Sequence, residues 1–520
     1  MGERLDEAWA LLPERLGAHV LLSASALALA VLIALPLAFA AIRRPRLRNA
    51  VLGAAGLIQT VPGLALVALF YPALLALSVL TSRWLGFGVP ALGFLPALLA
   101  LTLYALLPIL RNAVAGLAGL DPAVLEAADG VGMTRRQRLW RVEAPLAAPV
   151  VMAGVRTAAV LTLGTAVLAT TVGQPSLGDY IFSGLQTEDW TTVLFGCAAA
   201  AGLALITDRL LGLVEDGVAR RDRVRLLIGA AGLALGVSIA LGPMLLQRAS
   251  DAPVYRIGAK NFSEQFILAE LIGRRLAAQD LRSETRTGLG SAVIFRALAA
   301  GDIDVYVDYS GTLWTNVLGR TDTPRREVLL AELTTELKRV HGVTLLGPLG
   351  FENSYALTMR ADRAQALGVV SLDDLARRAP TLRLGADLEF LNRPEWAALR
   401  DAYGLEFRAS NAYTPTFMYR ALEGGEADVI SAFSSDGRLA GDRLRQLSDP
   451  RGAAPSYDAV LLISPQRASD PELRRVLAPL VKAISVERMR AANASVDSDA
   501  DKRSPAQAAT ALGRSLDQKR

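Results

Sequence analysis

The sequence predicts a two-part protein, with an N-terminal all-α polytopic membrane domain of about six spans and a C-terminal α/β domain of two lobes. Two observations support this division. Hydrophobic residues make up 52% of the 520 residues, but the long uninterrupted apolar runs all lie before Leu246. From Tyr255 onward, short strand-like runs alternate with amphipathic helical segments, which is the pattern of βα units. One polypeptide therefore carries a membrane-embedded half and a water-soluble half.

The membrane half contains apolar segments long enough to cross a bilayer, because a spanning helix needs about 20 apolar residues. We identify six, at residues 18–42, 50–79, 91–110, 150–172, 191–214 and 226–246. The second is long enough to tilt or to kink at Pro62. Gln59 and Thr60 beside this proline either line a pathway or mark only a packing kink. The first span is too long for a cleaved signal peptide.

Arginines gather in alternate loops, which predicts the orientation of the membrane domain. They are Arg43, Arg44, Arg46 and Arg48, then Arg111, Arg135, Arg136, Arg138 and Arg141, then Arg220, Arg221, Arg223 and Arg225. Cytoplasmic loops carry an excess of arginine and lysine, so we assign these loops to the cytoplasm of a protein in the inner or plasma membrane, in contact with lipid. Residues 1–17 and everything after Gln247 then lie on the extracytoplasmic side.

Composition argues against several classes of function. The single Cys197 lies within a span, and the two histidines are far apart, so we expect no disulfide, metal or cofactor. Residues 251–520 hold 36 basic and 35 acidic side chains, a balance that indicates no nucleic-acid surface. Nothing resembles the GxxxxGK[ST] loop that binds ATP, and no nucleophile motif is present. We therefore expect no enzyme activity in this chain.

The soluble half begins after a short linker, residues 247–254, and we place its domain at 255–503. We predict strands at 255–259, 284–287, 303–309, 355–359, 382–386, 428–433 and 459–463. Asn261 and Glu264 fit a capping box at the start of the first helix. We expect one lobe from about 254–354 plus 458–503, and the other from 355–457. Residues 504–520 are polar and are expected to fray as a tail.

The cytoplasmic loop 111–149 contains small residues and an acidic residue that suit a closely gripped helix. They are Glu126, Ala127, Ala128, Gly130 and Gly132. The loop resembles the EAA loop of ABC-importer permeases, although an ordinary amphipathic loop helix is the simpler alternative. The resemblance implies a membrane domain (18–246) of the ABC permease type, assembled as two copies of this chain with two copies of a separate cytosolic ATPase.

Both halves resemble the osmoprotectant importers for glycine betaine, choline and carnitine. In the membrane half the resemblance rests on LIQTVPGLALVAL and GQPSLGDYIFSGL. In the soluble half it rests on AKNFSEQFILAELI, GDIDVYVDYSGT, FENSYALTMR and DVISAFSSDGRL. It implies a periplasmic-binding-protein-like fold and uptake of a small quaternary ammonium compound as an osmoprotectant. Such a ligand has no N–H to donate, so a site must hold it with several aromatic faces.

The resemblance also implies individual contact residues. An aromatic cage falls on Tyr309, Tyr355, Phe433, Tyr457 and Tyr413, and partners for a ligand carboxylate fall on Lys260, Thr312 and Arg393, with Glu389 bracing Arg393. Phe433 stands where the family usually has tyrosine. Ser291 contacts the ligand or is a plain N-cap. Any one of these aromatic residues alone is more often a half-buried strand residue, and either cation is equally well a structural ion-pair partner.

Two alternatives remain at this point. The same architecture can import another betaine such as ergothioneine, with which the Phe433 substitution is compatible. A membrane ligand sensor without transport is the alternative from another class, and the EAA-like loop argues against it.

Overall fold

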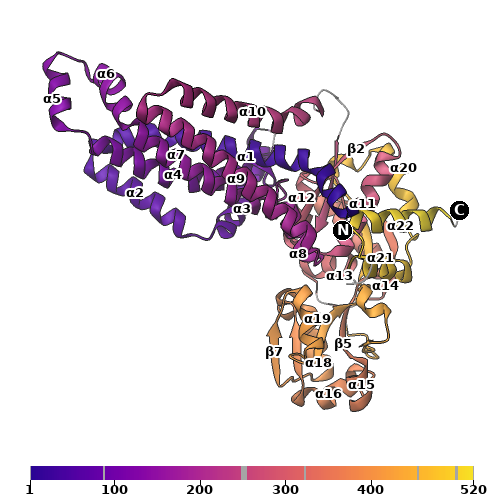
Figure 1. The fold of residues 1–520 in the computed structure, drawn as a ribbon. Helices are drawn as coiled ribbons and strands as arrows, with labels where there is room; N and C mark the ends of the chain where they lie inside the picture. Colours follow the sequence, from indigo (N-terminus) through magenta and orange to yellow (C-terminus); the bar gives the residue numbers. More distant parts are fainter. Residues whose placement is uncertain are drawn as a thin grey trace. The chain divides into compact units, whose positions relative to one another are not determined.

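The computed structural model describes residues 2–85, 88–247, 254–320, 322, 324–453, 456–497 and 502–518 (Figure 1). The chain divides into two compact units, one helical and one α/β, and each is described by itself. Most of the predicted linker, residues 248–253, lies outside the described residues.

The helical unit contains long helices joined by short ones. Its elements are α1 (Gly2–Ile42), α2 (Pro45–Thr60), α3 (Gly63–Leu85), α4 (Phe94–Ala118), α5 (Pro122–Gly130), α6 (Arg135–Arg138), η1 (Leu139–Glu143), α7 (Ala144–Thr165), η2 (Ala166–Val172), α8 (Gly178–Gln186), α9 (Trp190–Arg220) and α10 (Arg223–Gln247). Among the described residues, five helical segments are long and apolar enough to span a membrane, and the bent pair α2–α3 makes a sixth if it counts as one span. This agrees with the predicted number.

The predicted kink at Pro62 is a complete break, at which the two helices differ in direction by 102°. Helix α4 satisfies the polar groups that the break exposes. The Gln59 amide donates to the carbonyl of Tyr104 at 3.2 Å, and the Tyr104 hydroxyl donates to the carbonyl of Val61. Gln59 therefore has a packing role in this structure, and its place on a pathway stays a prediction.

Small residues allow the spans to pack closely. Helix α1 buries Ala30, Ala34 and Ala38 completely at a spacing of four residues, on the face that meets α4 (Figure 1). Without a strong hydrophobic drive in lipid, such close backbone approach supplies much of the packing energy between helices. Large apolar side chains such as Leu205 and Leu235 instead point outward and are more than half exposed, as expected for a lipid-facing surface.

The α/β unit contains two five-stranded sheets with the same topology. The first has the order β2-β1-β3-β10-β4, and the second has the order β7-β6-β8-β5-β9. The strands are β1 (Val254–Lys260), β2 (Arg282–Leu289), β3 (Val305–Tyr309), β4 (Thr344–Glu352), β5 (Tyr355–Arg360), β6 (Arg383–Ala386), β7 (Ala409–Ala412), β8 (Val429–Phe433), β9 (Leu444–Gln446) and β10 (Asp458–Ile463). The seven predicted strands are confirmed, whereas β4, β7 and β9 were not predicted.

In each five-stranded sheet, three neighbouring strands run parallel and the next strand in the sheet order runs antiparallel to them. In the first sheet β1, β2 and β3 are parallel and β10 pairs antiparallel with β3; in the second β6, β7 and β8 are parallel and β5 pairs antiparallel with β8. The start of the antiparallel strand therefore meets the carboxyl ends of the parallel strands. In α/β sheets this edge is where ligands bind.

Helices cover both sheets. They are α11 (Ser263–Ala277), α12 (Ser291–Ala300), α13 (Ser310–Thr312), α14 (Arg326–His341), α15 (Ala361–Leu367), α16 (Leu372–Arg378), α17 (Leu388–Leu391), α18 (Pro394–Tyr403), α19 (Pro415–Glu423), α20 (Pro471–Leu477), α21 (Val486–Asp497) and α22 (Pro505–Asp517). The chain passes between the lobes twice, at residues 353–354 and before β10. The two crossings are tied by a hydrogen bond from the backbone N–H of Asn353 to the carbonyl of Tyr457, at 2.9 Å.

Two local predictions are wrong, one for the C-terminal tail and one for the start of α11. The expected frayed tail is helix α22, whose Ala508, Leu512 and Leu516 are buried against the first lobe. Its signal was a capping box of Ser504 and Gln507, which is present in the structure. The capping box predicted at Asn261 and Glu264 does not form, because α11 begins at Ser263 with no side-chain cap, and the Glu264 carboxylate is engaged elsewhere.

Candidate functional site

A cavity of about 340 Å³ lies between the two lobes, at the strand edges described above. Every ligand contact predicted from the sequence lines it, namely Tyr309, Tyr355, Phe433, Tyr457, Tyr413, Lys260, Thr312, Arg393 and Ser291. The fold explains this convergence. Lys260 and Tyr309 are the last residues of β1 and β3, Phe433 is the last residue of β8, and Tyr355 is the first residue of β5.

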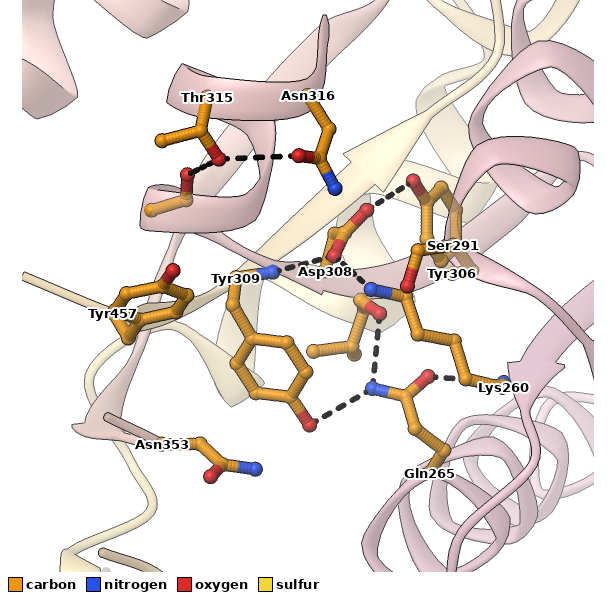
Figure 2. Close-up of polar contacts among 12 residues, drawn as sticks. Lys260, Gln265, Ser291, Tyr306, Asp308, Tyr309, Thr315, Asn316, Asn353 and Tyr457 are labelled. Carbon is orange, nitrogen blue, oxygen red and sulfur yellow. Dashed lines mark hydrogen bonds and ion pairs between the residues drawn. The ribbon is translucent and has the colours of Figure 1, made fainter. Parts of the chain in front are cut away.

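The first lobe holds its polar residues in a buried network (Figure 2). The Lys260 ammonium is 4% exposed and pairs with Asp308, which also accepts the Tyr306 hydroxyl at 2.6 Å and the backbone N–H of Tyr309 at 2.8 Å. The same ammonium lies 5.3 Å from the centre of the Tyr309 ring. Lys260 therefore carries a counterion already, and any ligand carboxylate would share it with Asp308.

The hydroxyl of Tyr309 is bonded on both sides. It donates to Glu264 Oε1 at 2.6 Å and accepts from the amide of Gln265 at 3.0 Å (Figure 2 shows the second bond). Burial, together with the neighbouring Glu264, raises the pKa of Tyr309 well above its usual value, so the phenol stays protonated. These bonds hold the ring of Tyr309 in one orientation at the cavity wall.

The second lobe orients its rings by packing. Tyr355 and Phe433 are cross-strand neighbours on β5 and β8, and their ring centres are 5.0 Å apart. Phe390 lies behind Tyr355 at 4.8 Å. Aromatic pairs at 4.5–7 Å are favourable beyond the area they bury. No described residue hydrogen-bonds the Tyr355 hydroxyl, so packing positions this ring.

Phe262 is an aromatic wall that was not predicted. It precedes α11, lines the cavity and stacks on Tyr309 at 6.2 Å and on Phe433 at 6.3 Å. It therefore joins rings from both lobes. In the sequence it stands within AKNFSEQF, a segment with no strand periodicity at that position, so only the three-dimensional structure places it in the cage.

Arg393 closes the polar end of the cavity. Its guanidinium donates to Glu389 at 2.5 Å and to the buried Glu395 at 3.4 Å, and it lies 5.4 Å from the centre of the Tyr355 ring. The Tyr457 hydroxyl also donates to Glu395. Burial alone would raise the pKa of Glu389, but the pairing with Arg393 outweighs it and lowers that pKa. Glu389 thus braces Arg393 as expected from the sequence.

Ser291 is not an N-cap. Gly290 occupies that position of α12, and the Ser291 hydroxyl instead donates to Glu389 of the other lobe at 3.4 Å. Tyr413 lines the cavity next to Gly385, and Thr312 lines it from α13. The structure therefore brings all the predicted residues to one cavity, and whether each of them contacts ligand stays a prediction.

The loop predicted at 111–149 is shorter in the structure, because α4 continues to Ala118 and α7 begins at Ala144. The residues between them, 119–143, form a helical hairpin in the helical unit (Figure 1). Asp121 caps α5 by accepting the N–H of Ala123 at 2.9 Å, and Arg138 ties the hairpin by pairing with Asp129 at 2.5 Å and Glu143 at 2.8 Å. Of the predicted coupling residues, Ala128 is buried, whereas Glu126, Ala127, Gly130 and Gly132 are exposed. Gly132 has a φ of +75°, which ends the helix sharply.

Apolar side chains remain uncovered on this hairpin. Val131 is 73% exposed and Trp140 is 68% exposed, although the loop is too polar to lie in lipid. Exposed large apolar side chains beside charged ones are typical of a surface that meets another protein.

Comparison with known proteins agrees with both halves. Residues 254–512 match the family described as the substrate binding domain of the ABC-type glycine betaine transport system. Residues 27–220 match the family described as the inner membrane component of binding-protein-dependent transport systems. The two matches together cover most of the chain.

Three known proteins are similar to all or part of this chain. The ergothioneine transport permease/ergothioneine binding protein EgtU of Helicobacter pylori (strain G27) is 28% identical over 455 residues, which cover 85% of this chain and 79% of that protein. The glycine betaine/carnitine/choline transport system permease protein OpuCB of Bacillus subtilis (strain 168) is 37% identical over 202 residues, 39% of this chain and 86% of that protein. A crystal structure of a glycine betaine/carnitine/choline ABC transporter is 25% identical, with a TM-score of 0.44, over 50% of this chain and 98% of its own.

The membrane half matches both a family model and a relative that is 37% identical over 86% of its own length. The chain belongs to the family of binding-protein-dependent ABC importer permeases, and it carries its own substrate-binding domain of the glycine betaine transport type.

Proposed function

We propose that this chain is the permease and tethered receptor of an ATP-driven importer for a small quaternary ammonium compound of the glycine betaine, choline and carnitine type. The observation that carries the proposal is the convergence of aromatic rings from both lobes, among them Tyr309, Tyr355 and Phe433, on one cavity. Each ring face contributes about 0.5–2 kcal/mol to the binding of a cation. Closure of the lobes around the ligand requires only a hinge at the two crossings.

The membrane half works as half of a pore in this proposal. Two copies of the chain form the pathway, and two copies of a separate cytosolic ATPase drive it through the hairpin around Glu126. The exposed Val131 and Trp140 supply an apolar contact for that subunit. The receptor lies on the extracytoplasmic side of the inner membrane, because the arginine-rich loops predict that the opposite side is cytoplasmic.

Ergothioneine is a second candidate ligand. The relative named for its transport is similar over both halves of this chain. Phe433 lacks a hydroxyl that the cage of the osmoprotectant receptors usually has, which leaves room for a ring-bearing betaine. Both candidates carry a trimethylammonium group, so the same cage serves either.

Calorimetric titration tests the ligand class. The full chain in lipid nanodiscs is titrated with glycine betaine, choline, carnitine and ergothioneine, and the titration is repeated with Tyr355→Ala. We expect selective binding of one compound and a loss of affinity of about a hundredfold or more in the variant, because the two tilted aromatic neighbours, Phe390 and Phe433, also lose their packing partner. If a well-folded wild type binds none of the four, the quaternary ammonium assignment is wrong and only the importer architecture stands.

A second experiment separates binding from coupling. Glu126→Arg places a cation in the middle of the exposed face of α5 and should abolish ligand-stimulated ATP hydrolysis in the presence of the partner ATPase, while ligand affinity stays unchanged. Glu7→Arg, on the extracytoplasmic segment, is the matched control and should leave both unchanged. Normal stimulation in the Glu126 variant would show that the hairpin is not the coupling surface.

A further inference from the structure

One buried carboxylate at the cavity lacks a cationic partner. Glu264 is 2% exposed and lines the cavity from the first turn of α11. It accepts hydrogen bonds from the Tyr309 hydroxyl at 2.6 Å, from the Asn353 amide at 3.0 Å and from the Asn493 amide at 2.9 Å. All of these donors are neutral, and no described arginine or lysine forms an ion pair with Glu264. Burial raises the pKa of Glu264, and hydrogen bonds from Ser435, Tyr309, Asn493 and Asn353 oppose this rise.

Two other buried carboxylates of this region have cationic partners. Asp308 pairs with Lys260, and Glu395 pairs with Arg393. Neutral donors orient a carboxylate and favour its charged form, but they do not cancel its charge, and burial favours the protonated form. A buried charge without a counterion is costly, so a cation that enters the low-dielectric space beside such a carboxyl favours its charged form.

The position of Glu264 directs this charge at the cage. Its Oε1 accepts a hydrogen bond from the hydroxyl of Tyr309. The ring of Tyr309 forms part of the cavity wall and stacks with Phe262. A phenol that donates to a carboxylate has a more electron-rich ring, and the ring face then attracts a cation more strongly. Asn493 also donates to the carbonyl of Ser435 at 2.8 Å, so the same cluster links the first lobe to the second.

We propose that Glu264 is the specificity-determining residue that selects a permanently cationic head group over an uncharged group of the same shape. With a cationic ligand bound, it acts as the counter-charge of the site, through the Tyr309 ring and through its own field. This inference rests on the proposed function, since it assumes a quaternary ammonium ligand, and it adds the residue that distinguishes charge from shape.

Matched pairs of probes separate charge from shape. Choline pairs with 3,3-dimethylbutan-1-ol, and glycine betaine pairs with 3,3-dimethylbutanoate; in each pair a quaternary carbon replaces the nitrogen. Binding to the full chain in nanodiscs is measured for wild type, for Glu264→Gln and for Asp449→Asn. The last variant is the control, because Asp449 accepts the hydroxyl of Tyr403 outside the cavity. We expect Glu264→Gln to lower the affinity for the cationic probe at least tenfold and the affinity for its isostere less than threefold. The control variant should change neither affinity.

The outcomes are distinct. If wild type binds neither cationic probe, the proposed function fails for these ligands and this inference fails with it. If wild type binds one of them but Glu264→Gln weakens that probe and its isostere equally, Glu264 is only structural and the proposed function stands. Glu264→Asp keeps the charge, so it should preserve the ratio of affinities within the pair even if it lowers both; loss of that ratio would overturn the inference independently of whether Glu264→Gln folds.

Discussion

The two lobes present aromatic rings to the same cavity but hold them in different ways. In the first lobe, a hydrogen bond to Glu264 and one from Gln265 fix the Tyr309 ring. In the second lobe, Tyr355 and Phe433 are held by packing against each other and against Phe390. A hydrogen-bonded ring is sensitive to the loss of a single atom, whereas a packed ring is sensitive to volume and shape. We therefore expect substitutions in the two lobes to disturb the cage in different ways.

The contact between the lobes should be the most sensitive point. Gly437, in the turn η5 (Gly437–Ala440) of the second lobe, packs so closely on α21 of the first that an added Cβ would lie 2.0 Å from the backbone nitrogen of Ala494. Gly437→Ala should destabilise the closed arrangement by about 3 kcal/mol, because backbone cannot move aside as a side chain does. Calorimetric affinity measures the effect. Gly441→Ala has nothing within 4 Å and is the control; equal affinities would show that the two lobes do not need this contact.

Removal of one hydroxyl from each lobe tests the comparison directly. Tyr309→Phe removes two buried hydrogen bonds, one to Glu264 and one from Gln265, and should lower the free energy of unfolding by about 2 kcal/mol. Tyr355→Phe loses no hydrogen bond to a described residue and should change it by less than about 0.5 kcal/mol. Urea unfolding of the 251–520 fragment measures both values. Similar losses in the two variants would contradict the distinction between the lobes.

A buried carboxyl near the contact between the lobes predicts a dependence on pH. Burial raises the pKa of Asp497 from 3.8 to about 7; the neighbouring Asp436 acts in the same direction, and Arg438, Ser263 and Lys502 oppose it. The folded state then holds this proton more tightly than the unfolded state, so stability should fall as pH rises from about 4 to about 7.

Asp497→Asn removes this titration. Between about pH 4.5 and about pH 7.5, the melting temperature of the variant should fall less than that of wild type. Thermal unfolding of the 251–520 fragment followed by circular dichroism measures the difference. Parallel pH profiles for the two proteins would exclude Asp497 as the group responsible.

The smallest effect is expected where packing already tolerates the change. Phe433→Tyr keeps the π face and adds a hydroxyl at the cavity wall, so stability should change by about 0.5 kcal/mol or less. The larger effect of this substitution should be on ligand selection, because added polarity at this wall should favour a small betaine over a ring-bearing one. Titration of the variant with glycine betaine and ergothioneine gives the ratio. An unchanged ratio would show that position 433 does not select the ligand.

Much of this architecture was predictable because it follows from periodic patterns. The apolar runs predicted the spans, alternating strands and helices predicted the two lobes, and the motifs around Tyr309 and Tyr355 predicted residues that do line the cavity. Strands β7 and β9 were missed because they are short and largely exposed, and carry little hydrophobic signal. Helix α22 was missed because its buried stripe uses alanine as well as leucine within a polar segment.

The sequence by itself determined the class of this protein, because membrane spans, strand periodicity and the charge of the loops depend on local composition. Only the tertiary structure decided how the cavity works. Asn261 and Glu264 had the spacing of a capping box, yet Glu264 turns away from its own helix and bonds Tyr309, 45 residues further along the chain. Phe262 likewise joins rings from both lobes. A buried polar group takes whichever partner the fold brings near, and local spacing carries no information about that choice.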